Sequence, residues 1–484
     1  MAEISYNDLR EYIEQIEKID RCQVIEGADW DLEIGVLLEA KAAIQDSPLL
    51  IFDKIKGYKQ GYRIASNVIH TPRRFAFMTG LPLEAKGVEL VQAWRERVKA
   101  GIKPVAPVEV ESGPLLENID QGDDVDLFKF PSPRWHEHDG GRYIGTGVMV
   151  INKDPDTGWV NLGTYRVQIH GKNRATIYMS PGRHGNIIRK KYWEKGLSCP
   201  VAVVCGSDPL LWTASSNPIP AGMSEYEYAG WLRGRPVEVV KGPVTGLPLP
   251  ARAEIVLEGE LLPPGVEDLQ EGPFGEWTGY YASGVKPEPA FRVKAVLHRN
   301  DPIILGEPPL LPTIDHFSFG KHIMRAAVIW DELDKQVPEV KGVWTMEGVG
   351  PMHMHVVSIK QRYGGHAKQA AMAVGGFYVS SYMNKICIIV DDDIDPANIH
   401  EVLWAIVTRC DPADSVEIIK HCWGSMLNAS LSPEKLAKGD LEHSRIVITA
   451  CKPYEWINKF PKTIGIRPEL VREVKAKWKH LFQE

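Results

Sequence analysis

Apolar residues near the N-terminus recur at the spacing of an amphipathic helix. Leu9, Tyr12 and Ile16 would lie on one face of it. Ser5 would cap this helix, with Asp8 three residues further on completing a capping box. Short apolar stretches then alternate with turns as far as about residue 105. This pattern predicts an N-terminal α/β domain.

Between about residues 140 and 300 the pattern changes to short apolar stretches separated by turn residues. The candidate strands are Gly147–Ile151, Arg174–Met179, Val201–Cys205, Glu254–Leu261 and Phe291–Leu297. Such spacing predicts an antiparallel barrel or sandwich. One helix, at about Ser224–Leu232, would interrupt it, with Ser224 as N-cap and Glu227 completing a capping box.

Beyond about residue 310 strands and helices are expected to alternate. The expected order is strand Val356–Lys360, helix His366–Val374, strand Ile386–Val390 and helix Ala397–Thr408. This order implies right-handed crossovers and a parallel sheet covered by helices. A further helix is expected over Pro468–Phe482. We therefore expect an α+β multidomain protein with domains at 1–115, 116–310 and 311–484, joined by a Pro- and Gly-rich linker near residues 104–114.

Composition narrows the class of protein. The chain has 484 residues, 25% of them charged, a net charge of -7 and no long basic tract, which argues against a nucleic-acid binder. No apolar run approaches the ~18 residues of a membrane span. The polar start Met1–Ser5 has no apolar signal core. Seven cysteines without a Cys-x-x-Cys pair favour reduced thiols and a cytoplasmic location.

Two polar segments about a hundred residues apart are the strongest candidates for chemistry. The first contains Asn161, Arg166 and His184, and the second runs Glu271–Trp277 with Gly and Pro between its two glutamates. On a flat strand, carboxylates five residues apart would face opposite ways, but a bent loop would aim both into one pocket. The nucleophile elbow, the Walker loop, His-Glu-x-x-His and Gly-x-Gly-x-x-Gly are absent, which disfavours common hydrolases, kinases and nicotinamide dehydrogenases.

Taken in order, these and later segments resemble the UbiD family of decarboxylases, which use prenylated FMN. The resemblance covers most of the chain and is carried by Asn161–Arg166, Arg183–Gly185, Glu225, Glu271 and Glu276, Arg362–Lys368 and Thr408–Pro412. Each segment alone is a weak signal, whereas the ordered set is specific. The resemblance implies a split-barrel flavin-binding domain in the centre of the chain and an α/β C-terminal domain that pairs subunits into a homodimer or larger homo-oligomer.

The resemblance also implies a metal and cofactor site. Asn161, His184 and Glu225 would bind Mn2+ or Mg2+ beside the cofactor phosphate, with K+ as an optional further cation; amide and carboxylate oxygens suit a hard cation. Residues expected to bind the cofactor are Thr164, Tyr165, Arg166, Tyr178, Met179, Ser180, Arg183, His184, Glu225 and Lys368. Without the resemblance, Asn161 and His184 would pass as turn residues and Glu225 and Lys368 as solvated helix residues.

Arg166, Glu271 and Glu276 are the expected catalytic residues. The planar guanidinium of Arg166 would hold a substrate carboxylate, and Glu271 would fix its orientation. Glu276 would protonate the carbon from which carbon dioxide departs. The implied reaction is the non-oxidative, reversible decarboxylation of an aromatic, heteroaromatic or α,β-unsaturated acid. Glutamate at position 276, where the ubiquinone branch of the family often has Asp, resembles the ferulate and hydroxybenzoate decarboxylases.

Two other functions remain open from the sequence. A metal-dependent hydrolase could use Asn161, His184 and Glu225, and would lack the colour of a bound flavin. A non-catalytic flavin-binding subunit would not need Arg166 or Glu276. For the decarboxylase, the implied partners are the carboxylic acid, carbon dioxide and a flavin prenyltransferase that supplies the cofactor. Leu310–Phe319 and His421–Met426 are candidate pocket segments.

Three other polar clusters are interpreted without a metal or ligand. His136–His138 lacks a third ligand at useful spacing. Met352–His355 alternates as a strand does, which favours packing. Asp391–Asp393 follows an apolar strand, at the carboxyl edge where ligands of α/β proteins often bind, but we favour a solvated strand end over a ligand site.

Overall fold

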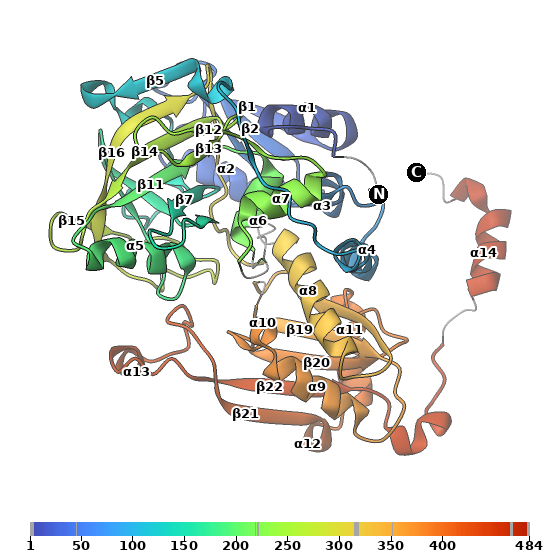
Figure 1. The fold of residues 1–484 in the computed structure, drawn as a ribbon. Coiled ribbons are helices and arrows are strands. Elements are labelled where there is room, and N and C mark those ends of the chain that lie inside the picture. The colour runs from blue at the N-terminus through green and yellow to red at the C-terminus, as the bar shows by residue number, and fades with distance from the viewer. Residues whose placement is uncertain are drawn as a thin grey trace.

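The computed structural model describes residues 4–44, 46–217, 219, 222–313, 319–350, 352–464 and 468–481. Within them the chain is a mixed α+β protein built around sheets (Figure 1). An N-terminal α/β unit and a curled antiparallel sheet lie together, and an α/β domain follows towards the C-terminus. The expected fold class is confirmed.

The N-terminal helix α1 (Leu9–Ile19) buries its predicted apolar face, because Leu9, Tyr12 and Ile16 are each at most 1% exposed. The predicted cap was wrong. The N-cap residue is Asp8, whose carboxylate accepts a hydrogen bond from the Glu11 amide at 2.9 Å. Ser5 is exposed, one turn before the helix starts.

The N-terminal sheet has the order β1-β2-β3-β17. Its strands are β1 (Cys22–Glu26), β2 (Leu49–Asp53), β3 (Arg63–Ser66) and β17 (Ile303–Leu305), and its other helices are α2 (Glu33–Ala42), α3 (Pro72–Thr79) and α4 (Gly87–Lys99). Strand β17 returns from far along the chain to pair in parallel with β3. The N-terminal unit is thus closed by residues that follow the whole central region.

The central sheet is antiparallel at every strand pair given by the structure and curls into a half-barrel (Figure 1). Its main path is β6-β9-β10-β16-β14-β11-β7-β8, with β15 and β5 also paired to β16. The strands are β5 (Asn118–Gln121), β6 (Arg142–Gly145), β7 (Met149–Lys153), β8 (Val160–Gly163), β9 (Val167–Gly171), β10 (Arg174–Ile177), β11 (Cys199–Val204), β14 (Ile255–Leu261), β15 (Asp268–Glu271) and β16 (Lys286–His298). A small sheet beside it joins β4 (Val108–Glu109), β12 (Glu238–Lys241) and β13 (Pro248–Pro250).

The expectation of one helix in this region was wrong. Helices α5 (His184–Glu194) and α6 (Pro209–Ser216) precede α7 (Glu225–Arg233). Ile187 and Ile188 are adjacent in α5, and the first is exposed while the second is buried. Two neighbouring apolar residues do not recur at helical spacing, so the sequence did not indicate this helix. Every residue of α6 from Pro209 to Ser215 is buried, so that helix has no polar face to produce a period.

The predicted capping of α7 is confirmed, because Ser224 is its N-cap residue and donates its amide to Glu227 at 2.8 Å. Short 3-10 turns complete the first two thirds of the described chain. They are η1 (Pro114–Glu117), η2 (Gly122–Asp124) and η3 (Leu127–Lys129).

The C-terminal domain contains the expected parallel strands. Strand β20 lies parallel to both β19 and β22, while β18 and β21 form antiparallel edges. The strands are β18 (Val340–Thr345), β19 (Met354–Ile359), β20 (Ile386–Asp391), β21 (Val416–Cys422) and β22 (His443–Ala450). The helices are α8 (Phe319–Asp334), α9 (His366–Gly376), α10 (Tyr378–Ser381), α11 (Ile399–Arg409), α12 (Pro412–Ser415) and α13 (Pro433–Ala437).

The tail runs through η4 (Tyr454–Lys459) to helix α14 (Pro468–Lys477) and the turn η5 (Lys479–Leu481). Helix α14 stands away from the other elements (Figure 1). The predicted end of this helix, Phe482, lies outside the described residues. None of the helices in the described ranges is both long and apolar enough to cross a bilayer.

Two apolar cores hold these parts. One fills the half-barrel, and the other joins the N-terminal helices, α6 and α7 to the C-terminal sheet. Helices α4 and α8 pack together in the second core, where Arg95 lies 4.2 Å from the Trp330 ring and donates Nε to Asp331 at 2.9 Å. This packing sets the C-terminal domain against the rest of the chain.

Candidate active site

The guanidinium of Arg166 is the centre of the candidate site. Arg166 lies in the short link between β8 and β9, and its residue is 9% exposed. Its Nε donates to Glu271 Oε1 at 2.6 Å and its Nη2 to Glu271 Oε2 at 2.7 Å. Nη2 also donates to Ser283 Oγ at 3.1 Å, and Nη1 donates to Glu276 Oε1. All three nitrogens therefore have partners.

The two glutamates reach Arg166 from one bent segment. Glu271 is the last residue of β15, and Gly272, with a φ of 86°, turns the chain immediately after it. The amide of Glu276 donates to the Tyr280 carbonyl at 3.1 Å. The structure thus brings Arg166, Glu271 and Glu276 together, in the arrangement expected of a Gly- and Pro-rich loop.

Burial differs between the two carboxylates. The side chain of Glu271 is 0% exposed and that of Glu276 is 11% exposed. Burial alone would lower the pKa of Arg166, but the hydrogen bonds and charge of Glu271 and the charge of Glu276 raise it above its ordinary value. Arg166 therefore stays cationic, and only Glu276 of the pair has access to solvent.

Aromatic rings enclose the guanidinium. Its Cζ lies 4.5 Å from the Tyr178 ring centre and 5.1 Å from that of Phe274. The Lys286 ammonium lies 3.3 Å from the Tyr178 ring centre. Tyr178, expected to bind the cofactor, thus contacts two cations and fixes one side of Arg166.

The sequence did not indicate three residues that hold this arrangement. The Tyr143 hydroxyl lies 3.3 Å from Glu271 Oε1 and 3.2 Å from Gln168 Oε1, and Gln168 Oε1 accepts the Gly272 amide at 3.0 Å. Ser283 is the third. Tyr143 and Gln168 are register partners across β6 and β9. That pairing places them under Glu271, and no local motif reveals it.

The expected metal ligands lie around strands β7 and β8. Asn161 Nδ2 donates to Asn152 Oδ1 at 3.1 Å, and Asn152 Nδ2 donates to the carbonyl of Gly185, next to His184, at 3.0 Å. The amide after Asn161 donates to Glu225 Oε2 at 2.8 Å. One connected set of hydrogen bonds thus joins Asn161 to Glu225 and reaches Gly185, the residue after His184.

These residues fit a hard divalent cation. Glu225 is 5% exposed, and in the described chain it forms no ion pair with a cationic side chain. Burial raises its pKa to about 7, although the Leu162 amide opposes the shift. A bound cation would relieve this buried carboxylate. Across the described ranges no three His, Cys, Asp or Glu side chains form a metal cluster, so an amide such as Asn161 would have to be the third ligand.

Most residues expected to bind the cofactor surround the start of α5. The Gly185 amide donates to the Tyr165 hydroxyl at 3.2 Å, and Asn186 Nδ2 donates to the Met179 carbonyl at 2.7 Å. Contacts of the others are Thr164 Oγ1 to Ser215 Oγ at 3.1 Å and the Arg183 amide to the Ser180 carbonyl at 3.3 Å. These contacts tie Tyr165 and Met179 to the first residues of α5, and Tyr165 directly precedes Arg166 in the chain.

In the described part of the chain, Lys368 forms no hydrogen bond or ion pair with these residues. It lies on α9 in the C-terminal domain, where its ammonium pairs with Glu417 of β21. A role at a cofactor phosphate would require this pair to separate, so that role remains a prediction.

One candidate pocket segment does reach the site. The Tyr178 hydroxyl lies 4.0 Å from Met426 Sδ, which places the end of the His421–Met426 segment beside a ring that also contacts Arg166. In the segment Leu310–Phe319, residues 314–318 lie outside the described residues. Leu310 itself packs in the half-barrel core.

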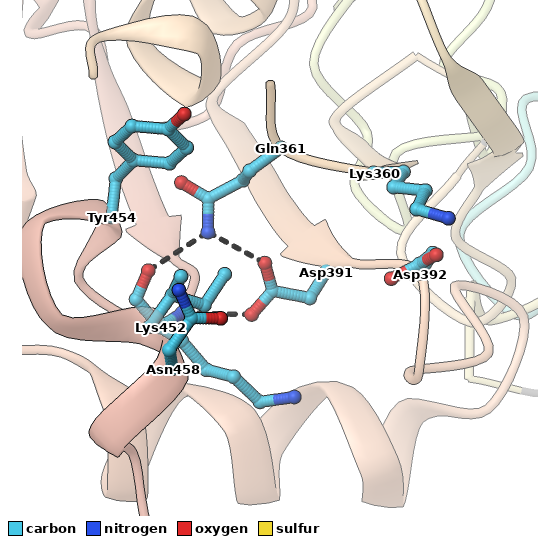
Figure 2. A pocket seen from close by; sticks show the side chains of 8 residues that line it. Lys360, Gln361, Asp391, Asp392, Lys452, Tyr454 and Asn458 are labelled. Atoms are coloured by element: carbon cyan, nitrogen blue, oxygen red, sulfur yellow. Dashed lines mark hydrogen bonds between the residues drawn. The ribbon is translucent and has the colours of Figure 1, made fainter. Parts of the chain in front are cut away.

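The interpretation of Asp391–Asp393 as a solvated strand end was partly wrong. Asp391 is 3% exposed and accepts from Gln361, the Arg409 guanidinium and the Lys452 amide, whereas Asp392 is exposed. A cavity of about 440 Å³ lies there, at the carboxyl ends of β19, β20 and β22 (Figure 2). Its lining is Lys360, Gln361, Asp391, Asp392, Lys452, Tyr454, Ile457 and Asn458, a set separate from the Arg166 site.

Known protein families match this chain in three consecutive ranges. Sequence profiles of the 3-octaprenyl-4-hydroxybenzoate carboxy-lyase (UbiD) match the N-terminal domain at residues 13–94, the Rift-related domain at 107–309 and the C-terminal domain at 319–450. A phenolic acid decarboxylase of Streptomyces sp. (strain D7) is 32% identical over 93% of each chain. One of Bacillus subtilis (strain 168) is 34% identical over 86% of this chain and 87% of its own.

Solved structures share the fold over nearly the whole length. An open form of the vanillic acid decarboxylase of Sedimentibacter hydroxybenzoicus, with truncated ShVdcD, has a TM-score of 0.86 at 29% identity, covering 99% of this chain and 100% of its own. Its closed form has a TM-score of 0.79 at 29% identity and covers 99% of both chains. An evolved dimeric form of the UbiD-class enzyme HmfF from Pelotomaculum thermopropionicum, in complex with prFMN, has a TM-score of 0.81 at 28% identity, covering 96% and 98%.

Proposed function

Because this chain belongs to the UbiD family of carboxy-lyases, we propose that it decarboxylates a phenolic or related aromatic acid with prenylated FMN and a divalent metal. The observation that carries the proposal is the position of Arg166 between two carboxylates of different exposure. Heteroaromatic and α,β-unsaturated acids share the same carboxylate chemistry and belong in the same test. Reversibility is part of the proposal.

The cofactor assignment rests on a relative and on the fit of this chain. The related HmfF structure holds prFMN. In this chain, Tyr165 and Met179 are hydrogen-bonded to residues at the start of α5, Thr164 precedes Tyr165, and Arg183 is the N-cap residue of that helix. When bound, the flavin supplies an electron sink for the electrons left by departing carbon dioxide. The protein has to orient the acid, exclude water and deliver a proton.

Arg166 would bind the substrate carboxylate. Glu271 occupies Nε and Nη2 with two hydrogen bonds, so the guanidinium plane is fixed before any substrate arrives. Nη1 faces Glu276 instead. A substrate carboxylate would replace Glu276 there, because two carboxylates held side by side at one nitrogen repel each other.

Glu276 would then act as the acid. Once displaced from Nη1, it can carry a proton and give it to the ring carbon that has lost its carboxylate. Its partly exposed side chain allows it to be reprotonated from solvent after each turnover. Glu271 has no such access, so it is suited to holding Arg166 rather than to moving protons.

Asn161, His184 and Glu225 would hold Mn2+ or Mg2+, with K+ as a further cation, and the metal would anchor the cofactor phosphate. A flavin prenyltransferase would supply the cofactor. The chain would act as a homodimer or larger homo-oligomer, as suggested by the dimeric HmfF form.

The test is reconstitution of the full chain with prenylated FMN and Mn2+, followed by a screen of phenolic, aryl, heteroaryl and cinnamic acids for carbon dioxide release. Exchange of deuterium into the product carbon should accompany release. Full activity from protein purified without any flavin would overturn the proposal. A metal-loaded protein without the visible absorbance band of a flavin would instead favour the metal-dependent hydrolase class.

A further inference from the structure

The segment His136–Tyr143 lies directly against the loop that carries Glu276. The Gly140 amide donates to the Pro273 carbonyl at 2.7 Å. A Cβ on Gly140 would lie 1.9 Å from the Gly272 carbonyl oxygen, so the two backbones touch and no larger residue fits. We call this segment the cradle. It supports the loop by backbone contact at its first turn.

Side chains of the cradle continue the contact along the loop. The Tyr143 hydroxyl lies 3.4 Å from the Pro273 carbonyl oxygen, and its ring centre lies 4.4 Å from that of Phe274. The His138 amide donates to the Tyr281 hydroxyl at 3.3 Å on the far side of the loop. The cradle thus holds the loop on both sides of Glu276.

Within the cradle, Asp139 makes the contact nearest to Glu276. Its side chain is 0% exposed. Oδ1 accepts the amide of Gly275, the residue before Glu276, at 3.1 Å, and Oδ2 accepts the amide of His136 at 3.0 Å. The His136 Nδ1 lies 3.5 Å from Oδ2. The buried Asp139 carboxylate therefore connects the cradle to the backbone at Gly275, next to Glu276.

We propose that Asp139 is a positioning residue for Glu276. The inference rests on the proposed function of Glu276 as proton donor. Glycine at position 275 has no side chain to anchor it, so the hydrogen bond to Asp139 limits its backbone freedom. Loss of that bond would let the Glu276 carboxyl move, and a shift of about 1 Å at a reacting group costs on the order of 100-fold in rate. Arg166 would remain in place, since Glu271 and Ser283 hold it.

A second buried aspartate provides a matched control. Asp154, 8% exposed, follows β7 and accepts the amides of Asp156 at 2.9 Å and Thr157 at 3.2 Å. It orders a loop by the same chemistry as Asp139. Its loop lies outside the cradle and does not carry Glu276. The Asp154 Oδ2 also accepts from Lys191 Nζ of α5 at 2.6 Å. Replacing Asp154 tests what loss of a buried carboxylate does away from the Glu276 loop.

The experiment compares Asp139→Ala, Asp139→Asn and Asp154→Ala in the reconstituted full chain. For Asp139→Ala we expect kcat to fall roughly 30–100-fold with KM within about threefold, because substrate binding by Arg166 is retained. Asp139→Asn should recover most of this loss, since its amide oxygen still accepts from Gly275. Asp154→Ala should keep kcat within about twofold of wild type.

Hydrogen–deuterium exchange supplies a readout that does not depend on activity. Asp139→Ala should increase deuterium uptake in the 272–281 loop, with or without flavin, and Asp154→Ala should not. Unchanged uptake in Asp139→Ala would overturn the inference, as would equal effects on kcat and KM with no recovery by Asp139→Asn. If the wild-type chain releases carbon dioxide from none of the acids, the proposed function fails, while the exchange data still decide whether Asp139 orders the loop.

Discussion

Arg166 and Glu271 meet through two parallel hydrogen bonds of nearly equal length, 2.6 Å and 2.7 Å. The pair is buried, and its geometry fixes both the position and the charge of the guanidinium. We expect Glu271→Gln to destabilise the protein by about 3–5 kcal/mol, because it removes the fully buried carboxylate of the two that compensate the Arg166 charge. Urea unfolding measures this loss.

Glu267→Gln is the control for that measurement. Glu267 also contacts arginines, at 2.9 Å from Arg292 Nε, but its side chain is 22% exposed. Its replacement should cost about 1 kcal/mol or less. Equal losses of unfolding free energy for the two variants would show that the Arg166–Glu271 pair stabilises the fold no more than a partly exposed pair does.

Glu276→Gln separates proton transfer from binding. The amide can still contact Arg166 but has no acidic proton to give, so turnover should fall by on the order of 100- to 10,000-fold. Bound flavin should be retained, and deuterium exchange into the product carbon should be lost with turnover. Decarboxylation at the normal rate would show that another group is the proton donor.

His184→Ala tests the expected metal site. His184 begins α5, beside the hydrogen bonds that join Asn161 to Gly185. We expect loss of Mn2+, measured by metal analysis, together with loss of flavin absorbance. Lys190→Ala, on the exposed side of the same helix, should retain both. Retention of metal and flavin in His184→Ala would remove it from the ligand set.

Trp277 connects the loop of Glu276 to the C-terminal domain. Its ring centre lies 5.1 Å from that of His353. We expect Trp277→Ala and His353→Ala each to lower kcat about 3–30-fold, and the double variant to lose little more, because both remove one contact. Trp456→Ala, in the tail, is the control and should leave kcat unchanged. If the two losses of kcat added fully in the double variant, the contact between Trp277 and His353 would make no contribution to turnover.

His355 should make the protein sensitive to acid. It is fully buried on β19, neither ring nitrogen has a hydrogen-bond partner in the described structure, and burial, then the charges of Arg325 and Arg445, lower its pKa far below 6.5. The unfolded chain takes up a proton near pH 6.5 and the folded chain does not. The stability contribution is therefore present above pH 6.5 and is lost as pH falls below it.

The thermal midpoint as a function of pH measures this effect. Each such histidine contributes about 1.4 kcal/mol per pH unit below 6.5. We expect His355→Leu to flatten the decline between pH 6.5 and 5, whereas His421→Leu, at a side chain 80% exposed, should leave it unchanged. An unaltered slope in His355→Leu would contradict a neutral buried imidazole.

Some contacts of the site were accessible from the sequence for a physical reason. The Gly and Pro residues between Glu271 and Glu276 predict a bend, and a bend brings two carboxylates to one side of the chain. Polar residues in a fixed order also identify the family. The helix α7 was found because its capping residues lie within four positions of each other.

Other contacts could not be predicted from the sequence. Asp139 and Tyr143 lie more than a hundred residues from the loop they support, and only the register of β6 on β9 brings them under it. Helix α6 was missed because a helix buried on all sides leaves no period. Asp391 was taken as solvated because its partners Gln361, Arg409 and Lys452 come from three separate segments.

The sequence by itself determined the fold class and the residue types of the site, since periodicity, capping and bent loops are local properties of a chain. The tertiary structure decided which of those residues meet. Long-range strand pairing set Arg166 against Glu271 and Glu276, joined Asn161 to the start of α5, and left Lys368 paired with Glu417. Burial also acts only in the folded chain, and it made Glu271 a support and left Glu276 access to solvent.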